Sequence, residues 1–401
     1  MPNRRGNLGA ARRGRGVPWT LVRIGGTRVT IDPSWLIIFA FVTFTSATAV
    51  LPARLVRESF EFGMPVMSGR IELWLAAVVS SVLFFGSLLV HEAAHALVAI
   101  RSGIPVRRIR LMIFGGVAEI AHEPTRAGQE FAITVVGPLA SAALGGLFLA
   151  AAANFAEATL PSMTARWLGE MNLFLAAFNL LPGFPLDGGR LLRSAVWGAT
   201  GNLRRATRIA SAGGVILGFA MMALGAVQFV TVNAMASAMW LVVLGWHLAS
   251  AARASDREMV VRERLRGLAV RDVVRRHVVA VPADGSAAEF MARGLAADPE
   301  GVYPVLSERR AVVGLVASAD VRATAPAKRV AVQLGELTHE LRDEHTLRLD
   351  DRLDRALALV METGQRQVLV LEEGRLAGRI DVDLLRQILR ARAAGPDGNE
   401  A

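Results

Sequence analysis

Long apolar runs dominate roughly the first 250 residues of the chain. The first run begins at Trp35 and lasts to about Leu51, and the second extends from about Glu72 to Ile100. Both reach the roughly 17 to 25 residues that an α-helix needs to cross the hydrocarbon core of a bilayer. Glu72 is the only charged residue between Ile71 and Val90. We therefore predict two membrane-spanning helices here.

Four more apolar segments complete the pattern, at about 131–155, from about 167 to Pro182, at about 210–229 and at about 232–248. Gly137-Pro138 predicts a kink in the third span, because proline has no N–H for the helical hydrogen bond. Pro182, Gly183 and Pro185 cannot continue a helix and end the fourth span. The predicted fold class is an α-helical polytopic membrane protein with about six transmembrane helices.

Two segments depart from the helical pattern. Leu21 to Ile31 is expected to form a short surface hairpin around Gly25-Gly26, ending at Asp32-Pro33. Arg107 to Ile120 alternates imperfectly around Phe114-Gly115-Gly116, which is typical of strands. Backbone of this kind at membrane depth must be buried in protein or line a wet cavity. We therefore predict a membrane-inserted β segment.

The C-terminal part has a charged, amphipathic pattern from Arg253 onward, and its first residues, to Arg266, read as a helical linker. Beyond them one sequence unit occurs twice, offset by 64 residues. Residues 270–273 correspond to 334–337, and residues 314–316 correspond to 378–380. In each unit an amphipathic helix leads to two apolar strands, 302–306 with 311–316 and 367–371 with 376–380. This pattern predicts a soluble α+β domain.

The chain divides accordingly into five segments. We expect a disordered basic tail at 1–18, a membrane domain at 19–252, a linker at 253–265, the repeat domain at 266–392 and a disordered tail at 393–401. Ala47-Thr48-Ala49 loosely resembles a signal-peptidase site. The basic lead before Trp35 is too long for a signal peptide, so the first span is read as uncleaved.

Composition places the chain in a membrane and orients it. It has 401 residues, 53% of them hydrophobic, and a net charge of +10. Lys328 is the only lysine, and the arginines cluster beside apolar runs, which favours positive-inside topology over a nucleic-acid partner. Six spans then put both termini in the cytosol and 156–166 outside. The absence of cysteine excludes disulfides, thiolate zinc ligands and cysteine nucleophiles.

The candidate chemistry is His91-Glu92-x-x-His95 in the second span. Residues four apart share one helix face, so both imidazoles suit one tetrahedral zinc. Glu92 can reach a metal-bound water without being a ligand. Chance is a poor explanation, because histidine and glutamate within apolar helices are costly and usually functional. His91 lies ten residues before Arg101, about 15 Å inside that end, which predicts one zinc within the bilayer.

Zinc needs a third protein ligand and an open position for water. Asp187 is the best candidate, because it follows a broken helix and its glycine neighbours let the backbone approach closely. A plain turn aspartate is the alternative. The remaining histidines fit surface or structural positions better; they are His122, His247, His277, His339 and His345.

Four motifs together resemble the site-2 protease family of intramembrane zinc metalloproteases, in its prokaryotic branch with a C-terminal CBS pair. They are His91-Glu92-x-x-His95, Gly115-Gly116, Gly137-Pro138 and the block from Asn179 through Leu186-Asp187-Gly188-Gly189-Arg190. The resemblance covers about 18–250 for the protease and 266–392 for a cytosolic CBS pair. It implies that His91, His95 and Asp187 bind zinc and that Glu92 is the catalytic acid and base.

The same resemblance implies further roles and partners. Asn179 would orient substrate or polarise the scissile carbonyl, and Gly115 and Gly116 would belong to a strand that pairs with unwound substrate. The substrate would be a membrane-anchored regulator, such as an anti-sigma or pro-sigma factor, in a bacterial cell membrane. A CBS-containing channel or transporter and a catalytically inactive relative are the alternatives. Neither needs the complete set of motifs.

CBS pairs commonly bind adenine nucleotides through a Gly-x-x-Thr/Ser-x-x-Asp ending. The first repeat keeps Asp320 but has Ala317 where a hydroxyl is expected, and the second has Leu384 at the aspartate position. We expect at most one nucleotide site, centred on Asp320. The pair is then expected to act mainly in homodimerisation and substrate docking.

Overall fold

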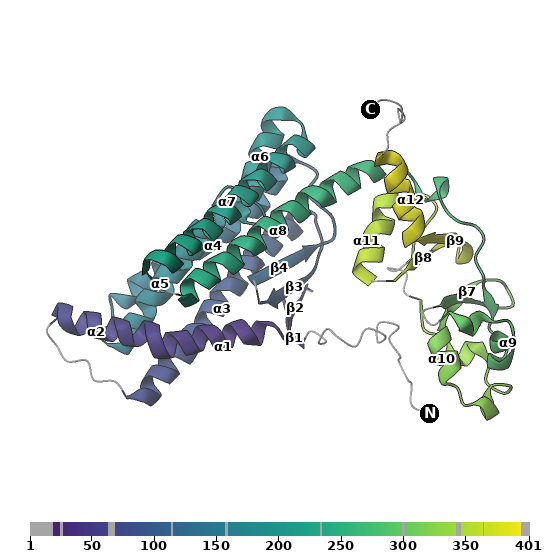
Figure 1. Ribbon diagram of the computed structural model, residues 1–401, viewed down its shortest axis with the longest axis horizontal. Helices are drawn as coiled ribbons and strands as arrows, with labels where there is room; N and C mark the ends of the chain where they lie inside the picture. The colour runs from purple at the N-terminus through teal and green to yellow at the C-terminus, as the bar shows by residue number, and fades with distance from the viewer. Residues whose placement is uncertain are drawn as a thin grey trace. The chain divides into compact units, whose positions relative to one another are not determined.

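The computed structural model describes residues 19–24, 27–62, 69–113, 115–156, 159–232, 235–298, 301–341, 346–363 and 365–393 (Figure 1). These residues form two compact units that divide between residues 259 and 260. The predicted tail at 1–18, the turn Gly25-Gly26, Phe114 and His345 lie outside the described residues. So does the tail predicted at 393–401, except for Ala393, which ends a helix.

The first unit is mostly helical. Its helices are α1 (Trp35–Thr45), α2 (Leu51–Phe62), α3 (Arg70–Arg101), α4 (Ala127–Ala152), α5 (Leu160–Asn179), α6 (Asp187–Thr200), α7 (Leu203–Val232) and α8 (Met235–Leu265). Among the described residues, four stretches are long and apolar enough to cross a membrane: Trp35–Glu58, Arg70–Arg101, Ala127–Ala152 and Leu203–Thr231. The structure thus confirms a mostly helical domain with four candidate membrane spans among the described residues, and the count of six spans stays a prediction.

The ends of two predicted spans differ from the structure. The first span does not stop at Leu51, because a π-helical segment, η2 (Ser46–Val50), joins α1 to α2. This wider turn ends two residues before Pro52, where a backbone donor is missing. The last span, predicted from about 232, begins at Met235. Helix α8 then continues to Leu265 and includes the predicted helical linker, because no glycine or proline interrupts it.

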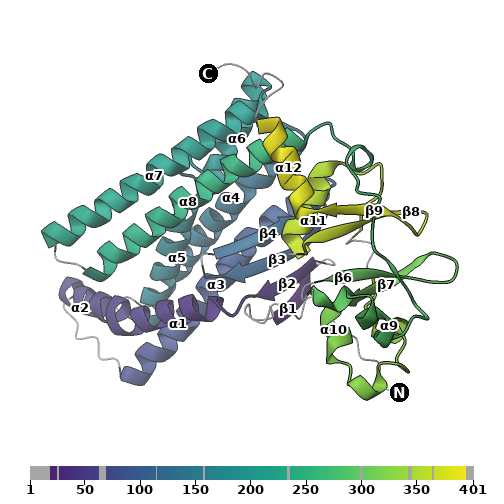
Figure 2. The ribbon, with the colours of Figure 1, turned by 45° about the vertical axis from the view of Figure 1, so that its right-hand side comes forward.

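A four-stranded sheet accompanies the helices. Its strands are β1 (Trp19–Ile24), β2 (Thr27–Ile31), β3 (Val106–Met112) and β4 (Gly115–Ile120), and they lie side by side in that order (Figure 2). The hairpin predicted at 21–31 is confirmed as the antiparallel pair β1–β2. The segment 107–120 forms a second antiparallel hairpin, and β2 joins β3 in parallel.

The sheet is fixed to the helices on one face and at one corner. Val29 and Ile109 are buried in a cluster with Ala99 of α3 and Ile133 of α4. At the corner, the backbone N–H of Asp32 donates to Leu111 O at 2.8 Å. Hydrogen bonds from the backbone of Ser34 and from the Arg110 side chain lower the pKa of Asp32 to about 2. The start of α1 is therefore held against β3.

The C-terminal unit contains the predicted repeat. Its first copy has η3 (Val270–Asp272), β5 (Val281–Pro282), α9 (Ala287–Ala292), η4 (Leu295–Ala297), β6 (Val302–Leu306), β7 (Val312–Ala317) and α10 (Ser318–Ala323). After η5 (Pro326–Lys328) the second copy has η6 (Leu334–Leu337), α11 (Leu353–Thr363), β8 (Gln367–Glu372), β9 (Arg375–Asp381) and α12 (Val382–Ala393). Both copies share a helix, two antiparallel strands and a second helix in the same order, α9-β6-β7-α10 and α11-β8-β9-α12, which agrees with the internal duplication.

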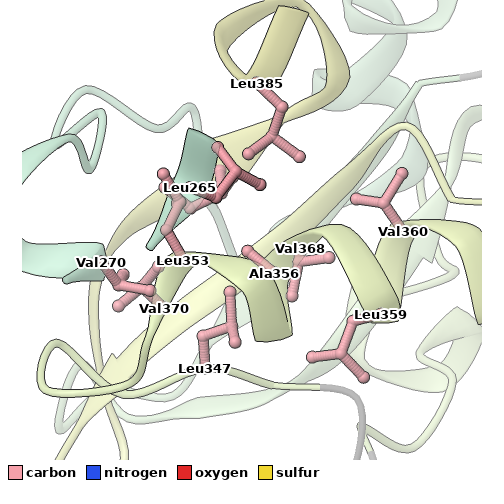
Figure 3. Close-up of a cluster of buried hydrophobic side chains, with 11 residues drawn as sticks. Leu265, Val270, Leu347, Leu353, Ala356, Leu359, Val360, Val368, Val370 and Leu385 are labelled. Carbon is pink, nitrogen blue, oxygen red and sulfur yellow. The ribbon is translucent and has the colours of Figure 1, made fainter. Parts of the chain in front are cut away.

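Each repeat has its own buried core. In the second copy, α11 and α12 pack on β8 and β9 through aliphatic side chains (Figure 3). Val270, which precedes the strands of the first copy, is buried in this second core. Positions 64 residues apart play the same part: Val316 and Ile380 are both fully buried.

The repeats are interlaced through their backbones. The N–H of Arg275, in the first copy, donates to Arg379 O of β9, and the N–H of His339, in the second copy, donates to Leu315 O of β7 at 2.8 Å. Glycine is required at Gly314 and Gly378, where the backbones of the two copies come close together. A Cβ on Gly314 would lie 2.3 Å from His339 O, and one on Gly378 would lie 2.7 Å from Arg275 O.

Gly314→Ala should therefore weaken the C-terminal unit by about 1–3 kcal/mol, the usual cost of overpacking a tight contact. Amide hydrogen exchange in the full-length protein should become faster in β6 and β7. Gly335→Ala is the matched control, because its new Cβ would lie 3.1 Å from Ala283 O, a contact that a small shift relieves. Equal protection in Gly314→Ala and wild type would contradict the close crossing.

Candidate active site

The two motif histidines lie in the later half of α3, and both are buried. His91 is 3% exposed and His95 is 9% exposed. Their Nε2 atoms lie 3.2 Å apart, because a spacing of four residues places both rings on one face of the helix. The pair thus presents two nitrogen donors to one point.

Asp187 completes a triangle of donor atoms. It is the first residue of α6, and its Oδ2 lies 3.1 Å from His91 Nε2 and 3.2 Å from His95 Nε2. These are the three residues that the structure brings together as a group able to hold a metal ion. The donors come from two helices that are almost one hundred residues apart in sequence.

The triangle fits a zinc ion. Ligand atoms of a tetrahedral zinc with bonds of about 2.0–2.1 Å lie about 3.3 Å apart, close to the observed separations. His95 Nδ1 donates to Ile133 O at 2.7 Å, because a carbonyl can only accept, and this leaves the Nε2 lone pair free for a metal. His91 Nδ1 contacts Ser141 Oγ at 2.9 Å in the same way. Such partners orient histidine ligands in zinc sites.

Helix α4 provides both these partners and the space between them. Ile133, Gly137 and Ser141 are each four residues apart and share one helix face. A Cβ on Gly137 would lie 2.1 Å from His95 Nε2 and 2.7 Å from His91 Nε2, so only glycine leaves room for the rings. From the sequence alone, Gly137-Pro138 predicts a kink, and this role of Gly137 is not evident. The four-residue spacing, which matches that of the histidines, was the available signal.

The loop before Asp187 explains the glycines that flank it. A Cβ on Gly188 would lie 2.2 Å from Leu180 O, and one on Gly189 would lie 2.4 Å from the nitrogen of Phe184. The loop is fixed in turn to α7, because Phe184 N–H donates to Ala210 O at 3.1 Å. The close approach that the sequence suggested is therefore between the start of α6 and its own preceding loop.

Glu92 lies beside the triangle and against the sheet. It interacts electrostatically with His91, His95 and Asp187. A Cβ on Gly116 of β4 would lie 2.4 Å from Glu92 Cγ, so Gly116 makes room for this carboxylate. Gly115 has a φ of +123°, a conformation that favours glycine. The hairpin β3–β4 is thus placed next to the candidate proton carrier.

Two other predicted site residues make contacts of a different kind. Asn179 ends α5, and its Nδ2 donates to Leu175 O of the same helix at 3.0 Å. Asp320 belongs to α10 in the C-terminal unit, where its Oδ2 pairs with His339 Nε2 at 2.7 Å. The structure therefore joins His91, His95, Asp187 and Glu92 with Gly116, and does not connect Asn179 or Asp320 to them by a described contact.

Comparisons with known proteins agree on one family. The model for Peptidase family M50 matches residues 79–163 and 151–224. Zinc metalloprotease Rip3 of Mycobacterium tuberculosis is 32% identical over 357 residues, 88% of each chain. Zinc metalloprotease sll0528 of Synechocystis is 28% identical over 381 residues, which cover 93% of this chain and 96% of that one.

Solved structures give weaker likenesses. The site-2 protease from Methanocaldococcus jannaschii is 23% identical, covers 60% of this chain and 95% of its own, and has a TM-score of 0.41. The CBS domain of a membrane protein from Sphaerobacter thermophilus is 16% identical, covers 34% of this chain and 96% of its own, and has a TM-score of 0.28.

The family match includes every residue of the donor triangle and Glu92. The relative that is 32% identical extends over nearly the whole chain. The sequence motifs, the buried triangle of donors and these matches lead to one conclusion: the chain belongs to Peptidase family M50, the site-2 proteases, and is a zinc metalloprotease.

Proposed function

We propose that this protein hydrolyses peptide bonds within or near transmembrane segments of membrane-anchored regulatory proteins. The observation that carries the proposal is the triangle of donors, 3.1–3.2 Å apart, held partly by a 32-residue apolar helix. Ionisable side chains in such helices are costly in free energy and usually belong to functional sites. A metal site in α3 supports chemistry on substrates that are themselves within the membrane.

The residues have separate tasks. His91, His95 and Asp187 would hold one zinc, and the fourth coordination position stays open for water. When bound, zinc supplies a Lewis acid that makes water acidic near neutral pH and polarises a carbonyl. Glu92 takes the proton of the attacking water and gives it to the leaving amine. Burial of the histidines keeps bulk solvent away from this exchange.

Strand β4 offers a place for the substrate. A transmembrane helix hides its carbonyls in its own hydrogen bonds, so it must unwind before attack. β4 is the last strand of its sheet, and Gly116 lies against Glu92. An extended substrate can add to this edge and satisfy its freed backbone groups beside the proton carrier. Gly115 and Gly116 would then contact substrate, and Asn179 would orient it.

The remaining assignments concern topology and the C-terminal unit. We propose that α5 and α8 also span the membrane, giving six spans with both termini in the cytosol, as the arginine distribution supports. The C-terminal unit would be a CBS pair that serves homodimerisation and substrate docking. It would have at most one adenine-nucleotide site, centred on Asp320, and His339 competes for that carboxylate. The substrate class is an anti-sigma or pro-sigma type of regulator.

Glu92→Gln should retain zinc but lower cleavage by about 10²–10⁴-fold, because the metal ligands are untouched while the proton carrier is lost. Membrane-peptide fragments in cells that carry the wild type or the variant can be compared by mass spectrometry. Glu72→Gln is the control on the same helix, since glutamine keeps the acceptor for Gly69 N–H. Wild-type fragment levels in Glu92→Gln would exclude this mechanism.

Asp187→Ala should lose most of the bound zinc, because two histidines alone fall short of the usual three protein ligands. The check is metal analysis of purified full-length protein after dialysis against a chelator. Asp320→Ala, in the C-terminal unit, should keep a full zinc content. If Asp187→Ala also kept it and remained active, another side chain would be the third ligand.

A reporter fused after Arg392 should be cytosolic, and one inserted in the segment 156–166 should be external, because arginine-rich loops stay on the cytosolic side. Paired alkaline phosphatase and fluorescent protein fusions measure this directly. The reverse pattern would place the metal site nearer the opposite membrane face.

A further inference from the structure

Helices α4 and α6 are joined by an ion pair in the interior of the membrane unit. Arg193 of α6 donates from Nε to Glu130 Oε1 of α4 at 2.8 Å, and its Nη2 contacts the same oxygen. Glu130 is 2% exposed and Arg193 is 7% exposed. Both charges are thus almost completely removed from water.

This ion pair is not an efficient way to stabilise the fold. Both donors share one carboxylate oxygen, and Oε2 of Glu130 is buried without a hydrogen-bond partner among the described residues. Removing two charges from water is costly in free energy, and an incompletely bonded pair recovers this cost only in part. A pair of well-packed apolar residues would often serve stability as well. The pair therefore calls for a role in placing one helix against the other.

The position of the pair shows what it can place. On α4, Gly137 contacts the histidine rings two turns after Glu130, about 10 Å along the axis. On α6, Arg193 lies about 9 Å along the axis from Asp187. The separations match: at one end both helices contact the histidines of α3, and at the other end the ion pair joins them to each other. A slip of one helical turn, about 5.4 Å, would remove Asp187 from the triangle.

Arg193 also contacts the loop that leads to Asp187. Its guanidinium carbon lies 5.2 Å from the centre of the Phe184 ring, and Phe184 is 5% exposed and bonded to Ala210 of α7. One side chain thus connects the loop before Asp187 and the helix after it to α4. The chain on both sides of Asp187, the preceding loop and α6, is therefore fixed relative to α4, the helix that orients the histidines.

We propose that Glu130 and Arg193 are positioning residues that set the register of α6 on α4 and so hold Asp187 at the metal. This inference rests on the proposed role of Asp187 as the third ligand. Neither residue touches the reacting atoms. Their effect should appear in metal affinity and geometry, and not only in thermal stability.

The test uses full-length protein, freed of metal and purified in detergent. Zinc affinity is measured by competition with a chromophoric chelator, and site geometry by the visible absorption of the cobalt-substituted protein. Glu130→Gln, which keeps the shape and one acceptor oxygen, should lower zinc affinity about 10–100-fold, the usual effect of losing support for a ligand. The double variant Glu130→Leu with Arg193→Met should regain thermal stability but not zinc affinity.

Glu170→Gln is the control for an interhelical ion pair outside the donor triangle, although Glu170 is more exposed than Glu130. Glu170 pairs with Arg54 and joins α2 to α5, so its loss should leave the cobalt spectrum and zinc affinity unchanged. Wild-type affinity and spectrum in both Glu130→Gln and the double variant would overturn the inference. If Asp187→Ala itself left the cobalt spectrum unchanged, the proposed ligand set would fail instead. Altered spectra in Glu130→Gln but not in Glu170→Gln would support the positioning role.

Discussion

The close packing of α3 against α4 is the contact on which the active site depends. Gly137 lies directly against the two histidine rings. The Nδ1 atoms of His95 and His91 are held by the carbonyl of Ile133 and the hydroxyl of Ser141, respectively. Any side chain at position 137 would separate the helices and turn the rings away from Asp187. The chemistry of three residues on α3 thus requires the smallest residue at one position on α4.

Around this contact, each neighbouring element fixes one part of the site. The sheet packs on the last turns of α3 through Val29 and Ile109, and its final strand makes room for Glu92 at Gly116. The loop from α5 to α6 is held on α7 by Phe184 and delivers Asp187. The polar groups are therefore held by helices and strands rather than by mobile loops, as a preorganised site requires.

Much of this arrangement was predictable from local patterns. Hydropathy gave α3 and α4 nearly complete, and the spacing of His91 and His95 predicted a shared metal. Contacts between distant segments were not predictable in this way. Gly137 looks like a helix-weakening residue until its neighbour is known, and Pro52 looks like a stop until the π-helical turn before it is seen. The charges of Glu130 and Arg193 suggest water exposure, because nothing local indicates that they meet in the interior.

The interlacing of the two C-terminal repeats has a consequence for how that unit folds and responds. The backbone N–H of Arg275 donates a hydrogen bond to a strand of the second copy, and that of His339 donates one to a strand of the first. The edge strand of each copy thus has a hydrogen-bond partner in the other copy. This exchange of partners favours folding of the two copies in one transition, as small domains usually fold. Separation of the two copies would break the backbone hydrogen bonds of Arg275 and of His339 together. Each copy therefore stabilises the sheet of the other.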